Sequence, residues 1–227
     1  MNQKIQYADW GLIDYKIAWD RQKELFEALC NLKSGGDNST QASVVQQFIL
    51  CEHPHVYTLG RNGHPDNMLI NEEFLRNINA SYYRIDRGGD ITYHGPGQIT
   101  GYLILDLEKL RLSLKEYIFC MEEMTIRTLD EYRIRATRMK SATGVWLDVN
   151  GKNPRKICAI GVRISRYVTM HGFAFNINTD LSYFSHINPC GFTDKGVTSL
   201  SEELKENIDI DSVKRKLYRH FCSLVLK

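Results

Sequence analysis

A glycine-rich run contains the first group of residues that could bind a substrate. Residues 87–98 read Arg-Gly-Gly-Asp-Ile-Thr-Tyr-His-Gly-Pro-Gly-Gln, and two strand-like, buried-looking segments, 82–85 and 102–107, flank them. Glycine allows positive φ angles and lets a ligand come close to the backbone. The run also offers four polar side chains: Arg87, Thr92, His94 and Gln98. We therefore predict a ligand-binding loop, and a long structural turn is the alternative.

A cysteine in a polar loop is the second candidate. Cys190 stands between Pro189 and Gly191, where a thiol would be partly exposed, whereas most of the other five cysteines lie in apolar surroundings. A thiol with a pKa of about 8.5 needs a cation, a base or a helix N-terminus nearby to become a thiolate at neutral pH. Cys190 is thus a candidate nucleophile, and an inert loop cysteine is the alternative.

Two strands carry further candidates. Lys156 opens the strand Lys-Ile-Cys-Ala-Ile-Gly, and burial there would lower the pKa of its ammonium group. A lysine that merely reaches solvent from a strand end is the alternative. His171 and Gly172 interrupt an otherwise apolar strand, where glycine often marks the close approach of a ligand or another backbone. A histidine satisfied within the core is the alternative for His171.

A zinc site is the weakest candidate. Cys51, His53 and His55 alternate, so an extended strand would present all three on one face. Pro54 interrupts that strand, and no second pair of ligands follows at the spacing of a metal site. We therefore predict no metal.

The sequence also contains none of the phosphate-binding, dinucleotide-binding, serine-hydrolase or metalloprotease signatures, so an enzyme of this kind would act on a substrate that is already activated.

The apolar spacing predicts helices that must position these residues. We expect helices over residues 12–33, from the cap Asn71 onward, from the cap Ser113 to about Tyr132, and over residues 211–226. Residues 34–38 supply the glycine and polar residues that end the first of them.

Strand patterns account for most of the remaining chain. We expect strands over residues 44–51, 56–59, 82–85, 99–107, 145–149, 156–164 and 167–177. Asn150-Gly151 is a hairpin signal, so the last three strands should form an antiparallel meander. The predicted fold class is α/β (α+β), with a mixed, largely antiparallel sheet flanked by helices.

Composition limits the class of protein. The 227 residues are 43% hydrophobic and 25% charged, which is typical of a globular protein, and we expect residues 1–227 to form one domain. A net charge of +2 does not favour a nucleic-acid partner, and no apolar stretch is long enough to span a membrane. Six scattered cysteines without a C-x-x-C pair indicate reduced thiols, and we expect a cytoplasmic location.

Three ordered segments resemble the lipoyl(octanoyl) transferases, the octanoyl-carrier-protein:protein transferases of lipoate biosynthesis. They are residues 87–102, residues 156–163 continued by 171–176, and residues 188–191 followed by 196–200. Residues 53–61 are also similar to the family pattern, so the resemblance covers most of residues 45–200. Cys158 departs from the pattern, because we expect a small residue such as alanine or serine there, and this leaves the number of reactive thiols open.

The resemblance implies a fold, a mechanism and a binding site. The fold is that of the catalytic domains of biotin and lipoate protein ligases. Cys190 would attack the octanoyl thioester of acyl carrier protein and hold the acyl group, while Lys156 would favour the thiolate and then exchange protons with the attacking amine. The implied substrate-binding residues are Arg87, Gly88, Gly89, Asp90, Ile91, Thr92, Tyr93, His94, Ala159, Ile160, Gly161, Gly172, Phe173 and Ala174.

The resemblance also implies the partners of the reaction. The acceptors would be lipoyl domains of 2-oxoacid dehydrogenase complexes and the glycine cleavage H protein. No cofactor would belong to the chain, since the phosphopantetheine arm belongs to acyl carrier protein. A thioester is already activated, so transfer to an amine needs no ATP, and small residues would let an extended acyl chain lie against the backbone.

Three other functions remain open from the sequence. The first is an ATP-dependent lipoate or biotin ligase of the same fold, which would not need Cys190. The second is a catalytically silent module that binds an acyl group or a carrier protein. The third is a cysteine hydrolase, in which His94 or His171 would act as the base for Cys190.

Overall fold

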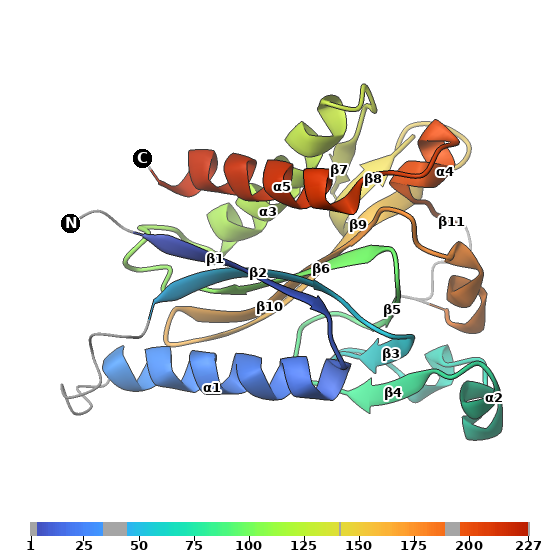
Figure 1. Ribbon diagram of the computed structural model, residues 1–227, viewed down its shortest axis with the longest axis horizontal. Coiled ribbons are helices and arrows are strands. Elements are labelled where there is room, and N and C mark those ends of the chain that lie inside the picture. The colour runs from blue at the N-terminus through green and yellow to red at the C-terminus, as the bar shows by residue number, and fades with distance from the viewer. Residues whose placement is uncertain (1–3, 34–44, 141, 189–195, 227) are drawn as a thin grey trace.

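Two β-sheets form the centre of the molecule in the computed structural model, which describes residues 4–33, 45–140, 142–188 and 196–226 (Figure 1). The larger sheet has the order β1-β2-β6-β10-β9-β8-β7, with β11 beside β9, and the smaller has the order β4-β3-β5. The strands are β1 (Ile5–Leu12), β2 (Gln46–Glu52), β3 (Val56–Leu59), β4 (Ser81–Arg84), β5 (Ile91–His94), β6 (Gln98–Ile104), β7 (Thr137–Met139), β8 (Ala142–Leu147), β9 (Arg155–Ser165), β10 (Val168–Asn176) and β11 (Gly196–Val197).

Most neighbouring strands run antiparallel. The parallel pairs are β1 with β2, β9 with β11, and β3 with β4. Strands β8, β9 and β10 form the antiparallel meander that the Asn-Gly turn predicts. The mixed, largely antiparallel sheet is therefore confirmed.

Helices cover both faces of the larger sheet. The helices of the described residues are α1 (Tyr15–Lys33), α2 (Glu72–Asn77), α3 (Leu114–Asp130), α4 (Leu200–Leu204) and α5 (Ile210–Val225), together with the 3-10 turns η2 (Pro65–Asn67) and η3 (Leu181–His186), and α2 packs against the smaller sheet. Figure 1 shows α3 and α5 on one side of this sheet and α1 on the other. Alternate residues of β2 follow the same division, since Phe48 packs in the α3–α5 core and Ile49 in the α1 core.

The predicted helix caps are confirmed. Ser113 Oγ accepts a hydrogen bond from the Glu116 backbone N–H (3.2 Å), and the Glu116 carboxylate accepts one from the Ser113 N–H (2.8 Å). This reciprocal capping box explains why α3 begins at Leu114. Asn71 accepts from the backbone N–H of Phe74 and caps α2 in the same way.

The prediction for the N-terminal segment is wrong at its start. Residues 5–12 form β1, an edge strand of the larger sheet, and the apolar pattern does not predict it because most of its side chains are partly or fully exposed. The first helix begins at Tyr15 and not at residue 12, since the Asp14 carboxylate accepts hydrogen bonds from the backbone N–H groups of Lys16 and Ile17. Residues 34–38, predicted to end the helix, lie outside the described residues.

Three further expectations need correction around the glycine-rich run. The pattern predicts that residues 82–85 are buried, but β4 is an edge strand of the smaller sheet, and only Ile85 of this segment is buried. Residues 87–98 are not a continuous loop, because β5 occupies their centre. The strand expected over residues 99–107 ends at Ile104. The short elements β7, β11 and α4 were not predicted.

No helix within the described part of the chain is both long and apolar enough to cross a bilayer.

Candidate active site

A cavity of about 780 Å³ lies against the inner strands β6, β10 and β9 of the larger sheet. Its other walls are the glycine-rich residues 87–92 with His94, the η3 turn, and part of β8. Every predicted substrate-binding residue except Tyr93 lines this cavity, as do Lys156 and His171. Segments about a hundred residues apart in the sequence, such as residues 87–92 and the η3 turn, therefore meet at one site.

Small side chains on neighbouring strands leave room for the cavity. In the registers of the sheet, Ala174 lies beside Ala159 on one side and Thr100 on the other, and Gly172 lies beside Gly161. Because alternate residues of a strand share a face, these five residues form one continuous floor. A large side chain at Thr100, Ala159 or Ala174 would fill space that the cavity now occupies.

Two glycines of this floor allow a backbone carbonyl of a neighbouring segment to pack closely against them. A Cβ atom at Gly161 would lie 2.9 Å from the carbonyl oxygen of Gly88, and one at Gly172 would lie 2.4 Å from that of Gly101. Both distances are too short for a side chain. The structure therefore gives these glycines a packing role, which differs from the sequence-based explanation that glycine leaves space for an acyl chain.

Arg87 braces the glycine-rich loop against the smaller sheet. Its buried guanidinium group donates through Nη2 to the carbonyl oxygen (2.7 Å) and hydroxyl (2.9 Å) of Thr58, and through Nη1 to the Gly88 carbonyl. On its other side the loop is bonded to β9, because the Gly88 N–H donates to the Val162 carbonyl (2.9 Å). The loop thus bridges the two sheets above the cavity floor.

His94 is a neutral hydrogen-bonding residue in this structure. The side-chain amide of Gln98 donates to the Tyr93 carbonyl and to Asn176 Oδ1, so its oxygen accepts from His94 Nδ1 (2.8 Å). His94 Nε2 is then the acceptor for the Thr58 hydroxyl (3.3 Å). Burial lowers the pKa of His94 to about 3. At neutral pH it is therefore a very weak base, which disfavours the role that a cysteine hydrolase would require.

His171 holds the start of the same loop. It is buried, with φ at 62°, and its Nε2 donates to the Asp86 carboxylate at 3.0 Å, one residue before Arg87. Burial lowers the pKa of His171, although the Asp86 carboxylate opposes this shift. His171 is thus a buried histidine whose side chain has a hydrogen-bond partner. Because it lines the cavity, this bond holds the start of the glycine-rich loop beside the cavity.

The three residues considered for zinc serve different contacts. His53 is buried, its Nδ1 donates to a backbone carbonyl at 2.7 Å, and its Nε2 accepts from the Tyr102 hydroxyl at 2.6 Å. Cys51 Sγ lies 3.4 Å from the same Nε2, whereas His55 stacks on the ring of Tyr183 with centroids 4.2 Å apart. No three His, Cys, Asp or Glu side chains gather as a metal site among the residues that the structure describes.

Tyr93 supports the site from behind. It packs in the core of the smaller sheet, where its ring lies 5.4 Å from that of Tyr57, and its hydroxyl bonds to His55 Nδ1 at 2.7 Å. The alternation along β5 sends Thr92 and His94 to the cavity and Tyr93 to the opposite face. The structure therefore separates Tyr93 from the predicted binding residues.

Lys156 lies on the cavity wall, near the N-terminal end of β9. Its Nζ is 4.7 Å from the centre of the Trp146 ring, a cation–π contact. Its backbone carbonyl accepts from the Thr198 N–H (3.0 Å), and in the register of β9 and β11 it pairs with Val197. Lys156 is thus beside the first described residues after the Cys190 segment.

Cys190 itself lies outside the described residues. The described residues on either side, Asn188 and Gly196, both line the cavity. Of the other cysteines, Cys158 is fully buried, and burial raises the pKa of its thiol to about 12. This thiol will remain protonated at neutral pH, so Cys158 does not add a second reactive thiol to the site.

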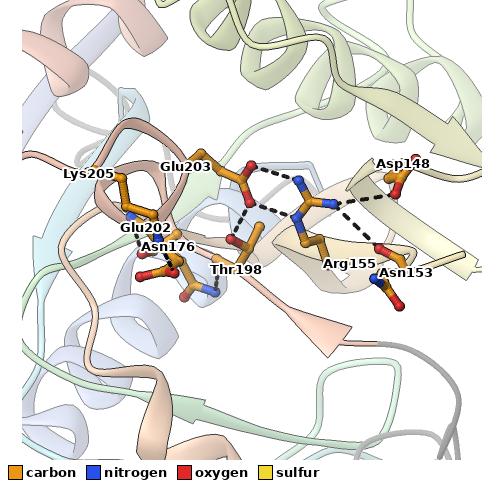
Figure 2. Close-up of polar contacts among 9 residues, drawn as sticks. Asp148, Asn153, Arg155, Asn176, Thr198, Glu202, Glu203 and Lys205 are labelled. Atoms are coloured by element: carbon orange, nitrogen blue, oxygen red, sulfur yellow. Dashed lines mark hydrogen bonds and ion pairs between the residues drawn. The ribbon is translucent and has the colours of Figure 1, made fainter. Parts of the chain in front are cut away.

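A polar network anchors the chain that follows the Cys190 segment (Figure 2). Arg155 makes two hydrogen bonds to the Glu203 carboxylate, at 2.6 and 2.7 Å, and the Thr198 hydroxyl donates to the same carboxylate at 2.6 Å. Asn176 Nδ2 donates to the Thr198 carbonyl at 3.0 Å. Sequence reasoning named none of these four as site residues, and the only signal was that some of them fall within the family-like segments.

Comparison with known proteins identifies the family. The model of the lipoyl protein ligase A/B catalytic domain matches residues 14–222. The octanoyltransferase of Bacteroides fragilis is 56% identical over 218 residues, covering 96% of each chain. That of Flavobacterium johnsoniae is 50% identical over 226 residues, covering 99% of this chain and 97% of the relative. The chain belongs to the lipoyl(octanoyl) transferase family. It is accordingly an acyltransferase.

Solved structures confirm the fold expected for a lipoyl(octanoyl) transferase. The bi-partite lipoate protein ligase of Thermoplasma acidophilum superposes with a TM-score of 0.70 at 14% identity, covering 98% of this chain and 84% of the ligase. The biotin protein ligase of Aquifex aeolicus gives a TM-score of 0.51 at 12% identity, covering 98% and 70%. At such low identity these similarities concern the fold alone.

Proposed function

We propose that this acyltransferase moves an octanoyl group from the thioester of acyl carrier protein to a lysine of a lipoyl domain, through an acyl-enzyme on Cys190. One observation carries the proposal. Lys156 and both flanks of the Cys190 segment line a single cavity with a floor of small side chains. The relatives named octanoyltransferases supply the identity of the acyl group.

In the first step, the Cys190 thiolate attacks the thioester carbonyl. A new carbon–sulfur bond forms, the bond to the phosphopantetheine sulfur breaks, and that sulfur leaves as a thiolate that takes up a proton. A nearby cation favours the thiolate form of cysteine, and Lys156 is the candidate for this cation. The cavity would hold the octanoyl chain, each buried methylene contributing roughly 0.8 kcal/mol.

In the second step, the acceptor lysine attacks the acyl-enzyme as a neutral amine. The amide bond forms, the bond to Cys190 breaks, and the amine loses a proton to Lys156 in its neutral form or to the departing thiolate. The donor thioester supplies the free energy, so we propose no cofactor and no ATP. The proposed acceptors are lipoyl domains of 2-oxoacid dehydrogenases and the glycine cleavage H protein, and the proposed location is the cytoplasm.

Intact-protein mass spectrometry tests the acyl-enzyme. Incubation with octanoyl-acyl carrier protein, without ATP, should add one octanoyl mass to the wild-type chain and none to Cys190→Ala. Cys222→Ala is the matched control, because Cys222 is a partly exposed thiol on α5, and this variant should gain the same mass as the wild type. An adduct that persists in Cys190→Ala, or a requirement for ATP, would contradict the proposal.

Variants at Lys156 test its proton chemistry. Lys156→Ala should slow the transfer by about 10²-fold or more, the usual contribution of a positioned acid or base. Lys156→Arg keeps a cation but cannot release its proton, so it should still form the acyl-enzyme and be impaired mainly in transfer to the acceptor. Equal rates for the wild type and Lys156→Ala would exclude this role.

A further inference from the structure

The side chain of Asn67, in the η2 turn, contacts the glycine-rich loop. Asn67 Nδ2 donates to Asp90 Oδ2 at 2.6 Å. The other oxygen of this carboxylate accepts from the Ile91 backbone N–H at 2.7 Å. Asp90 therefore uses both carboxylate oxygens in contacts within the protein, and the Asn67 contact is a short, charge-assisted hydrogen bond.

The backbone of the same turn contacts the segment that leads toward Cys190. The Asn67 carbonyl accepts from the Asn188 N–H at 2.8 Å, and the Leu69 N–H donates to the His186 carbonyl at 3.0 Å. An isolated antiparallel bridge joins Met68 to Ile187 between these two bonds. Residues 67–69 and 186–188 thus form a short, regular backbone pairing, and Asn188 stands two residues before Cys190.

The η3 turn before this pairing rests on a rigid aromatic platform. The Tyr57 hydroxyl lies 2.9 Å from both the Tyr183 carbonyl and His186 Nδ1. The Tyr183 ring stacks on Tyr93 at 4.9 Å and on His55 at 4.2 Å. The smaller sheet therefore fixes η3, and the pairing with residues 67–69 fixes residues 186–188.

We infer that Asn67 is a positioning residue that sets the distance between the acyl-binding loop and the chain leading to the nucleophile. Its side chain holds the loop at Asp90, and its carbonyl holds Asn188, so one residue connects two walls of the cavity. This inference rests on the proposed function. A displacement of about 1 Å between reacting groups can cost about 10²-fold in rate, so loss of this link should affect acylation more than folding.

Exchange of the two side chains tests the link. Asn67→Ala should slow single-turnover octanoylation of Cys190 at least tenfold, and Asn67→Asp should slow it further, because two carboxylates would then face each other. Asp90→Asn alone should also slow it. In the double variant Asn67→Asp/Asp90→Asn, the amide at position 90 can donate to the carboxylate at position 67 and still accept from the Ile91 N–H. This exchange should recover most of the wild-type rate.

Asn71→Ala is the matched control for a general loss of stability. Asn71 caps the neighbouring helix α2, so its loss should lower the thermal midpoint while octanoylation keeps the wild-type rate. Wild-type rates in Asn67→Ala and Asn67→Asp, or an exchange variant as slow as the slower single variant, would overturn the inference while the proposed function stands. A wild-type chain that gains no octanoyl mass would overturn the proposed function, and the inference with it.

Discussion

Burial decides which side chains near the cavity can exchange protons. His94 and His53 are inside the protein and bonded to neutral partners, and burial lowers their pKa values to about 3 and about 4. Both are therefore neutral at physiological pH. Lys156 and Cys190 remain the proposed proton-exchanging and nucleophilic groups, because the histidines serve as fixed hydrogen-bonding residues.

These two histidines predict a pH dependence of stability. Both folded-state pKa values lie below the ordinary value of 6.5, so the unfolded chain binds protons first as the pH falls. The free energy of unfolding should decrease from pH 6.5 to pH 5 by up to about 1.4 kcal/mol per pH unit for each histidine. Urea unfolding at several pH values measures this slope.

A matched pair of variants assigns the slope. Burial also lowers the pKa of His171, so His94→Gln should reduce the pH dependence without abolishing it, and His64→Gln, at an exposed histidine, is the control for the substitution itself. A wild-type stability that stays constant from pH 6.5 to pH 5 would contradict the buried neutral state.

Contacts between elements set the shape of the site. The glycine-rich loop reaches β9 only because Gly161 has no side chain, and the chain after the Cys190 segment reaches β9 through Arg155, Glu203 and Thr198 (Figure 2). Neither contact follows from the pattern of a single strand or helix. Each depends on two segments that meet in the folded chain.

Gly161→Ala should separate the loop from β9. The added Cβ would lie 2.9 Å from the Gly88 carbonyl oxygen, so we expect a loss of about 1–3 kcal/mol in the free energy of unfolding. Gly88→Ala is the control across the same contact, because its Cβ would lie at an ordinary 3.4 Å from the Val162 carbonyl oxygen. Urea unfolding should show the smaller loss for Gly88→Ala, and equal losses would contradict the explanation.

Glu203→Gln should loosen β11. Loss of the charge-assisted bonds to Arg155 should cost about 1 kcal/mol or more, which corresponds to roughly fivefold faster opening. The Gly196 amide donates to the Pro154 carbonyl and the Thr198 amide to the Lys156 carbonyl. Hydrogen exchange of these two amides measures the change. Glu202→Gln alters an exposed pair with Lys205 on the same helix and should leave both rates unchanged. Faster exchange in both variants would contradict a specific role for Glu203.

At the scale of the whole molecule, the cavity is a space between parts of the chain that fold onto two different sheets. The larger sheet provides the floor, and the loop braced on the smaller sheet provides a wall. A ligand in this space would contact both parts and stabilise their association. The expectation that residues 1–227 form one domain remains a prediction.

Acylation should therefore raise the thermal midpoint. We expect the octanoylated chain to unfold several degrees above the free chain, because each kcal/mol of added stability is worth about 2–4 °C at this size. Differential scanning calorimetry after reaction with octanoyl, butyryl and acetyl thioesters should give midpoints that rise with chain length. Equal midpoints for the acetyl and octanoyl forms would place the acyl chain outside the cavity.

The sequence by itself determined much of the local structure and the family. Caps at Asn71 and Ser113, the apolar spacing of α1 and α5, and the Asn-Gly turn each act within a few residues, so their signals are readable along the chain. Motif residues in three separated segments were sufficient to indicate the acyltransferase family.

Only the tertiary structure decided how the motif residues divide their work. It assigned Gly161 and Gly172 to backbone packing, Tyr93 to the core behind the site, His94 to a neutral hydrogen-bond network, and Asn67 to a link between two cavity walls. Burial, close approach and hydrogen-bond partners depend on atoms supplied by segments far apart in the sequence. Local periodicity carries no information about those distances, and for this reason the roles became visible only in the folded chain.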